Sequence, residues 1–203
     1  FRFFLSFLAC ITLIIQFVTR AQVKPFNPVN FFSFFTIESN ILVACILFLS
    51  SIGTATFGLS KQFGILRGAV TVYILTTGLI YFLLLRGLEE SLQTVIPWVN
   101  VVLHYIMPIV MLLDWTMNPP TKAITWKHAV SWLIFPLLYV VYSLIRGPFV
   151  DWYPYPFLDP RIGGYDRVFF YSVGIAAVIG VICIIVKMLG NRNIKVRVSN
   201  LRG

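Results

Sequence analysis

The sequence is poor in charge, because Asp, Glu, Lys and Arg together make up 11% of its 203 residues and only seven are acidic. Hydrophobic residues make up 59% of the chain, and its mean hydropathy is +0.88. A soluble domain of this length has no use for so much apolar surface, whereas a polytopic membrane protein does. The composition therefore excludes an ordinary soluble domain.

Motifs for metal binding and redox chemistry are also missing. The three cysteines, Cys10, Cys45 and Cys183, lie inside apolar runs, show no CxxC spacing and are interpreted as small core residues. His104 and His128 are the two histidines of the chain. One His with one Glu and one Asn makes a poor ligand set for zinc. We therefore expect no metal and no other cofactor.

What the chain does contain is six apolar runs separated by charged or Pro-containing segments. About 20 apolar residues cross a bilayer as a helix, within a range of roughly 17 to 25. The runs at approximately 3–19, 34–57, 65–85, 97–114, 127–145 and 167–189 meet or nearly meet this length. We predict an all-α polytopic membrane protein, with a single six-transmembrane-helix bundle over residues 1–190 and a basic cytoplasmic tail at 191–203. No internal repeat or second domain is visible.

The basic residues indicate how this bundle is oriented. With the N-terminus inside, ten of the 16 Lys and Arg residues fall on the inner side, and five of the seven acids fall on the outer side. The positive-inside rule then places both termini in the cytoplasm. The net charge of +9 indicates topology, and we expect no nucleic-acid partner. We expect an integral, multi-pass protein, in the cytoplasmic membrane if the source is prokaryotic; because the chain begins at Phe1, natural residues are expected to precede it.

Polar side chains inside the spans are costly, so their positions are informative. In the stretch FFSFFTIESNIL, residues 31–42, Ser33, Thr36 and Asn40 have the spacing that places them on one helix face. Glu38 lies about 200° round the helix from Thr36 and points elsewhere. In the fourth span, Asn100 and His104 are four residues apart and share a face.

With the predicted topology, polar groups from several spans lie at one depth, in the outer half of the bundle. The inner halves are nearly pure Leu, Ile, Val and Phe. This asymmetry predicts a polar-lined cavity that opens outward or sideways to the outer leaflet. Candidates for substrate binding or oxyanion stabilisation are the polar groups at that depth: Asn40, Tyr81, Asn100, Tyr139, Tyr142, Ser143 and Arg146.

Each of these groups also has an ordinary structural role. Thr and Ser in membrane helices bond their own i−4 carbonyl, Asn joins helices, and Tyr and Arg side chains reach toward the interface. His104 is different, because an ionisable residue well inside a span is a functional candidate by default. A Ser-His-Asp triad lacks its acid, since Asp114 lies roughly 15 Å along the helix from His104. Thr36 as nucleophile with His104 as general base is one of several possible pairs.

The segment GPFVDWYPYPFLDPRIGG, residues 147–164, is rich in Pro and aromatic residues. Trp152, Tyr153 and Tyr155 suit the membrane–water interface, and proline removes backbone donors. The segment is either an interfacial aromatic belt or a lid over a site beneath it. The sequence favours the belt.

Three blocks resemble one family of membrane proteins: VNVVLHYIMPIVMLLDW, WYPYPFLDPRIGGYDRVFF and FFTIESNIL. The resemblance is to the androgen-induced and androgen-dependent TFPI-regulating proteins, of which this chain looks like a distant relative. Characterised members are multi-span threonine hydrolases that cleave fatty acid esters of hydroxy fatty acids. The resemblance implies that Thr36 is the nucleophile, that His104 is its partner, and that membrane lipids or a lipid-like ester are the substrate.

Three functions follow as hypotheses. The first is an intramembrane hydrolase of lipid esters that uses Thr36 and His104. The second is a non-catalytic lipid-binding or sensor protein. The third is a small-molecule or proton-coupled transporter that uses Glu38, His104 and Arg146, which is disfavoured because no polar path crosses the inner halves and no inverted repeat is visible.

Overall fold

The computed structural model describes residues 1–56, 61–89 and 96–200, and within these ranges the secondary structure is helical, without strands. Six helices are long and apolar enough to cross a membrane: Arg2–Gln22, Phe35–Gly53, Phe63–Leu85, Pro97–Met117, Trp126–Val150 and Gly164–Arg192. They coincide with the six predicted runs, so the prediction of an all-α chain with six helices long and apolar enough to span a membrane is confirmed. The architecture is compatible with an integral multi-pass membrane protein; the side on which each end lies stays a prediction.

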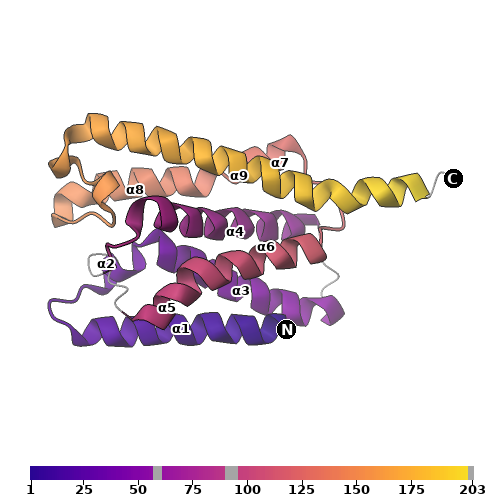
Figure 1. Cartoon of the computed structure of the whole chain (residues 1–203), viewed down its shortest axis with the longest axis horizontal. Helices are drawn as coiled ribbons and strands as arrows, with labels where there is room; N and C mark the ends of the chain where they lie inside the picture. The colour runs from indigo at the N-terminus through magenta and orange to yellow at the C-terminus, as the bar shows by residue number, and fades with distance from the viewer. Residues whose placement is uncertain (57–60, 90–95, 201–203) are drawn as a thin grey trace.

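The six spans form a bundle in which α4 (Lys61–Ile80) runs through the middle (Figure 1). It packs against α3 (Phe35–Thr56), α6 (Met107–Met117) and α9 (Gly164–Asn200), while α1 (Arg2–Gln22) packs mainly on α3. The fifth span consists of α7 (Trp126–Ser131) and α8 (Ile134–Val150). The start of α1 and the C-terminal end of α9 lie toward one end of the bundle, here called the terminal end. The opposite end, the loop end, holds α2 (Pro28–Phe32) and residues 151–163.

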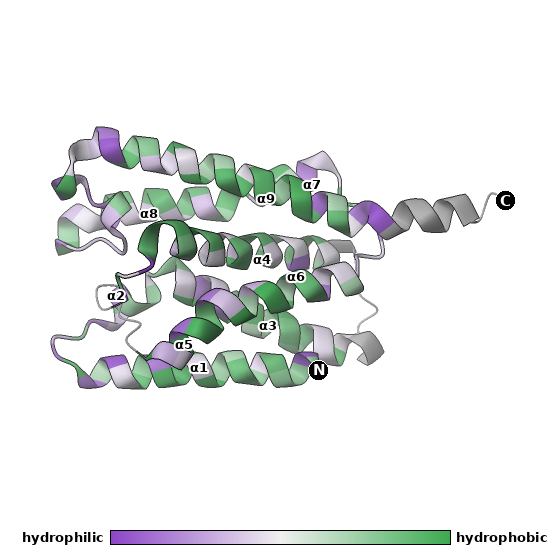
Figure 2. Ribbon diagram, viewed as in Figure 1, coloured by the Kyte–Doolittle hydropathy of each residue, from purple (hydrophilic) through white to green (hydrophobic). Residues whose placement is uncertain are grey.

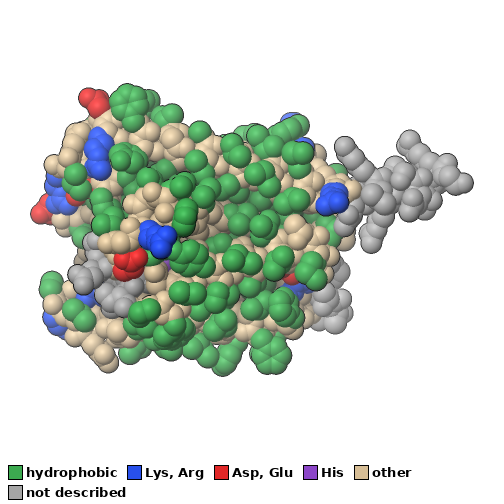
Figure 3. All heavy atoms as spheres, in the orientation of Figure 1, with side chains coloured by type: hydrophobic (Ala, Val, Ile, Leu, Met, Phe, Trp, Pro, Cys, Tyr) green, Lys and Arg blue, Asp and Glu red, His purple; other side chains and the backbone are tan. Residues whose placement is uncertain are grey.

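The outside of the bundle is apolar, and its mainly hydrophobic interior also holds a set of buried polar side chains. Figure 2 shows hydrophobic residues along all the long helices, and Figure 3 shows charged side chains gathered mostly toward the two ends of the visible face. Buried side chains include Thr12, Ser39, Asn40 and Thr71, each with no exposed area. Phe149 and Phe170, by contrast, are largely exposed. This distribution suits a chain whose surface faces lipid and whose polar groups must bond one another.

The stretch 31–42 is not one helix. Pro28 begins α2, and the side chain of Asn27 caps it by accepting hydrogen bonds from two backbone N–H groups. The helix ends at Ser33, and α3 begins at Phe35. The prediction that Ser33 shares a helix face with Thr36 is therefore wrong, because a turn separates them.

Two π-helical turns interrupt the spans near the loop end. The first, η1 (Tyr81–Leu85), ends the third span, and the second, η2 (Val102–Ile106), joins α5 (Pro97–Val101) to α6. A π turn shifts the backbone bonding from i+4 to i+5, as in the bond from Met107 N–H to the Val102 carbonyl. Such turns are frequent at functional sites.

The terminal end is closed by charged and aromatic side chains. Arg2 donates to Asp114 over 2.6 Å, and Arg67 lies over the Trp115 ring. Asp114 therefore lies at the terminal end, away from His104, in agreement with their predicted separation along the helix. Residue 57, where the second run was expected to end, and Glu90 lie outside the described residues. Since α9 continues to Asn200, part of the segment predicted as a tail is helical.

Candidate active site

Thr36 lies in the first turn of α3, with 8% of its surface exposed. One turn further on, the amide of Asn40 donates to the Thr36 carbonyl over 2.9 Å and to the Leu103 carbonyl over 3.3 Å. Because Leu103 belongs to η2, Asn40 ties the start of α3 to the turn that carries His104. Thr36 and Asn40 are four residues apart and lie on one helix face, as their sequence spacing predicts.

His104 lies on η2 and is 3% exposed. Its Nδ1 lies 3.2 Å from the backbone carbonyl of Asn100, and its Nε2 lies 3.3 Å from Oγ1 of Thr36. A carbonyl oxygen only accepts hydrogen bonds, so this contact requires the proton of the neutral ring on Nδ1. The lone pair of Nε2 then faces the Thr36 hydroxyl, which is the arrangement of a general base and its nucleophile.

Tyr155 completes the group from the other side. Its hydroxyl oxygen accepts a hydrogen bond from the backbone N–H of Thr36 over 3.2 Å and lies 3.4 Å from Oγ1 of the same residue. The ring is buried between Phe34 and Phe157. Burial raises the pKa of Tyr155 to about 12, so the phenol stays neutral. Because its oxygen accepts from Thr36, its own hydrogen is left to donate.

Behind His104 lies a second layer of polar groups. The Tyr81 ring stacks on the imidazole, with ring centroids 3.9 Å apart. The side-chain amide of Asn100 donates to the Tyr81 hydroxyl over 2.5 Å. The Tyr81 hydroxyl in turn donates to Glu89 over 2.6 Å. The two π turns thus bring the Tyr81 and His104 rings face to face.

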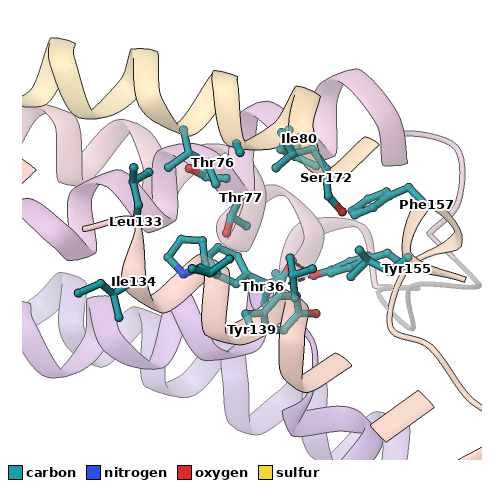
Figure 4. Close-up of a pocket in the computed structure, with 18 of the residues that line it drawn as sticks. Thr36, Thr76, Thr77, Ile80, Leu133, Ile134, Tyr139, Tyr155, Phe157 and Ser172 are labelled. Carbon is teal, nitrogen blue, oxygen red and sulfur yellow. Dashed lines mark hydrogen bonds between the residues drawn. The ribbon is translucent and has the colours of Figure 1, made fainter. Parts of the chain in front are cut away.

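A cavity of about 470 Å³ begins at Thr36 and Tyr155 (Figure 4). It lies between α3, α4, α8 and α9, and towards the terminal end it is lined by Val130, Leu133 and Ile179. Its lining is almost entirely apolar. The prediction of a polar-lined cavity is therefore wrong. The polar side-chain groups of the lining are a few hydroxyls of Thr, Ser and Tyr, and the cavity extends beyond them toward the terminal end.

The cavity also reaches the side of the bundle. Val130, Ile134 and Leu137 line it from α7 and α8 and are each more than half exposed. Ala176 of α9 lines it and is exposed as well. Side chains that line a cavity and also face outward mark an opening, here between α8 and α9.

The structure brings some of the predicted site residues together and keeps others apart. Thr36 and His104 are in contact, and Asn40, Asn100 and Tyr81 support them through the bonds given above. Tyr139 lines the cavity, where its hydroxyl donates to the Ser33 carbonyl over 3.0 Å.

Three predicted residues of α8 lie away from this contact. Tyr142 bonds the Ser33 hydroxyl over 2.9 Å. Arg146 donates to Asn30 over 2.6 Å. The Ser143 hydroxyl is buried and has no hydrogen-bond partner among the described residues.

Sequence reasoning missed Tyr155, which was interpreted as an interfacial residue. The interpretation of residues 147–164 as an interfacial belt is wrong for Tyr155, Phe157 and Leu158, which are buried and line the cavity. Pro154 and Pro156 flank the tyrosine and restrict the backbone, which is a signal for a rigid insertion rather than a loose loop. The segment is held at its outer edge by Arg161, which pairs with both Asp151 and Asp159 and lowers the pKa of Asp159.

Within the described parts of the chain, no three His, Cys, Asp or Glu side chains are placed to hold a metal ion together. The chain matches no protein-family model, no curated protein and no solved structure.

Proposed function

We propose that this protein is an intramembrane hydrolase of lipid esters, with Thr36 as nucleophile and His104 as general base. The observation that carries the proposal is the position of the Thr36 hydroxyl. It lies 3.3 Å from Nε2 of His104 and opens onto an apolar cavity of about 470 Å³. The family resemblance of the three sequence blocks implies the same pair of residues.

The first half of the reaction forms an acyl-enzyme. Oγ1 of Thr36 attacks the carbonyl carbon of the ester while Nε2 of His104 takes the hydroxyl proton. The oxyanion that forms accepts a hydrogen bond from the Tyr155 hydroxyl, whose hydrogen is free to donate. When the C–O bond of the ester breaks, the leaving alkoxide receives the proton from His104, and the acyl group stays on Thr36.

Water completes the cycle. His104 takes a proton from a water molecule, whose oxygen attacks the acyl carbon and again forms an oxyanion next to Tyr155. Collapse of this intermediate breaks the bond to Oγ1, and His104 returns its proton to Thr36. The products are one alcohol and one carboxylic acid, and the enzyme is restored.

The cavity suits an acyl chain. From Val130 to Val140 its lining follows the fifth span over roughly 15 Å, at about 1.5 Å per residue. An extended chain gains about 1.2 Å per bond, because three backbone bonds span about 3.6 Å. About twelve carbons of an acyl chain therefore fit along this wall, and the opening between α8 and α9 lets a longer chain or an incoming lipid pass to the surrounding membrane.

The proposal is tested with purified protein in detergent micelles, using a fluorophosphonate probe and a set of long-chain fatty acid esters. Thr36→Ala and His104→Ala are expected to lose probe labelling and ester turnover, and Thr36→Ser is expected to retain both in part. Thr71→Ala is the matched control, because it removes the hydroxyl of a different buried threonine, on α4, which bonds the Arg67 carbonyl. Hydrolysis that survives in Thr36→Ala refutes the proposal.

The same experiment distinguishes the hydrolase from a non-catalytic lipid-binding protein, a function for which the apolar cavity alone would be sufficient. A protein that only binds lipid retains a fluorescent fatty acid in the cavity but is labelled by the probe at no residue. Labelling of wild type that disappears in Thr36→Ala supports the hydrolase.

A further inference from the structure

A continuous set of contacts joins His104 to a carboxylate at the loop end of the bundle. The imidazole stacks on Tyr81 with an interplanar angle of 20°. The Tyr81 hydroxyl donates to Oε1 of Glu89 over 2.6 Å, and the same oxygen accepts from the backbone N–H of Gly87 over 3.0 Å. The proposed mechanism makes no use of Tyr81 or Glu89.

Tyr81 is fixed from two directions. Its hydroxyl accepts from the Asn100 amide on the fourth span and donates to Glu89 after the third span. The ring is 1% exposed and also has edge contact with Tyr105. Since the backbone carbonyl of Asn100 holds Nδ1 of His104, one residue positions both stacked rings.

Glu89 is the carboxylate that this arrangement presents to His104. The hydrogen bond from Tyr81 lowers the pKa of Glu89, and the Gly87 N–H and the nearby Arg86 act in the same direction. Glu89 is therefore ionised at neutral pH. Asp114 does not compete for this role, because Arg2 and Arg67 hold it at the terminal end.

We propose that Tyr81 and Glu89 are positioning residues for His104: Tyr81 fixes the plane of the ring, and Glu89 supplies the negative charge that balances the imidazolium. The catalytic meaning of this assignment rests on the proposed function. When Nε2 takes the proton of Thr36, a positive charge forms over the face of the Tyr81 ring, which attracts cations. A carboxylate bonded to the phenol adds to that attraction, and no proton leaves Tyr81.

The missing acid of the catalytic group is thus replaced by a carboxylate one ring away. In a Ser-His-Asp triad the carboxylate bonds Nδ1 directly and holds the tautomer. Here the Asn100 carbonyl holds the tautomer, and the charge of Glu89 acts through Tyr81. The two tasks of one aspartate are divided between two groups.

Kinetics provide the first test. Glu89→Gln keeps an acceptor oxygen for Tyr81 and Gly87 but removes the charge. We expect kcat to fall about three- to tenfold with KM within about twofold, because a charge that stabilises only the protonated ring acts on the transition state. Tyr81→Phe keeps the stack but breaks the link to Glu89, so it is expected to cost a similar factor. The double variant is expected to lose no more than either single variant.

Asp166→Asn is the control, since this carboxylate is exposed at the start of α9 and is expected to leave kcat unchanged. A kcat of Glu89→Gln equal to that of wild type overturns the role of the charge. Fully additive losses in the double variant overturn the coupling through Tyr81.

NMR of the two histidines gives a test that needs no activity. In His128→Gln, His104 is the one remaining histidine of the sequence, so its ring signals are unambiguous. We expect the Nδ1–H tautomer and ring protons shielded by Tyr81, both retained in Tyr81→Phe, with the shielding lost in Tyr81→Leu. The pH at which the ring titrates is expected to change in Glu89→Gln, and Tyr81→Phe is expected to raise the pKa of Glu89 toward its ordinary value.

An unchanged His104 titration in Glu89→Gln, or an unchanged Glu89 pKa in Tyr81→Phe, overturns the proposal. The two inferences fail separately. If wild type hydrolyses no ester while these NMR couplings are present, the proposed function is refuted and the coupling of Glu89 to His104 is supported.

Discussion

The backbone N–H of Thr36 donates a hydrogen bond to the hydroxyl of Tyr155, over 3.2 Å and across 119 positions of sequence. This bond joins the first turn of α3 to the segment between α8 and α9. It places a buried, neutral phenol within 3.4 Å of Oγ1 of Thr36 and leaves its hydrogen for an incoming group. The Tyr155 hydroxyl is therefore the donor that an oxyanion on Thr36 would meet first.

Removal of this donor should slow hydrolysis without preventing folding. In Tyr155→Phe we expect kcat to fall by about 10- to 100-fold, because the loss of one oxyanion donor typically costs this much or more. Steady-state kinetics on a long-chain ester measure the effect. Tyr165→Phe is the matched control, since Tyr165 is mostly exposed. A Tyr155→Phe variant with the kcat of wild type would show that the oxyanion is stabilised by another group.

The pH dependence of Tyr155 follows from its raised pKa. A phenol with a pKa of about 12 keeps its hydrogen up to that pH and loses it above. Its donated hydrogen bond is thus present throughout the neutral and moderately alkaline range. We expect Tyr155→Phe to lower kcat by the same factor at each pH between about 7 and 10, which a pH–rate profile of both proteins measures. A factor that diminishes steadily over this range would contradict the assignment.

The cavity predicts selection by chain length. Ile179 is buried and lines the cavity toward the terminal end. In Ile179→Trp, the larger ring shortens the space left for an acyl chain, so kcat/KM for a palmitoyl ester should fall about tenfold or more, while that for a butyryl ester should stay near the wild-type value. A parallel thermal unfolding curve controls for overpacking, which costs about 1–3 kcal/mol where space is lacking. Equal losses for both esters would show that the acyl chain lies elsewhere.

Gly78 sets the distance between α4 and the turn that carries His104. A Cβ at this position would lie 2.8 Å from the Pro108 ring and 2.9 Å from the His104 carbonyl oxygen. Gly78→Ala must push the helices apart, so we expect a loss of about 1–3 kcal/mol in the free energy of unfolding and slower labelling of Thr36. Denaturant unfolding and the rate of probe labelling measure the two effects.

Gly174→Ala is the matched control for this change. Nothing lies within 4 Å of a Cβ at this position of α9, so the alanine is expected to stabilise the helix by about 0.5–1 kcal/mol. If Gly78→Ala proved as stable as Gly174→Ala, the close contact between α4 and η2 would not exist in solution.

Asp114 provides a test of which acid matters. Its side chain is 2% exposed and bonds Arg2, with Arg67 close by. Asp114→Asn leaves the buried Arg67 and the partly buried Arg2 without their counter-charge, and we expect it to lower the free energy of unfolding by about 3 kcal/mol. The kcat per folded molecule is expected to remain that of wild type, measured after correction for the folded fraction. A large loss of kcat in folded Asp114→Asn would instead show that this residue contributes to catalysis.

Much of the fold could be predicted from the sequence, because the length of an apolar run is a local property. The bilayer sets that length, so the six spans follow from composition and spacing alone. The depths of Thr36 and His104 also follow from the sequence, since topology and helical rise fix the depth of each residue. Spacing leaves these two as one of several possible pairs, and it is the family resemblance that implies this pair. Contact between them also requires that both side chains face the inside of the bundle. For Thr36, the helical spacing with Asn40 indicated which helix face that is.

The tertiary structure alone decided what surrounds that pair. Tyr155 lies in a segment without helical periodicity, where the direction of a side chain depends on the neighbours into which it is packed. The π turns at Tyr81 and His104 alter helix phase by one residue, and no pattern in the sequence marks them. The cavity is a space left between α3, α4, α8 and α9, so its apolar character depends on which faces happen to meet. Sequence determined where the polar groups lie along each span; helix packing determined which of them share a site.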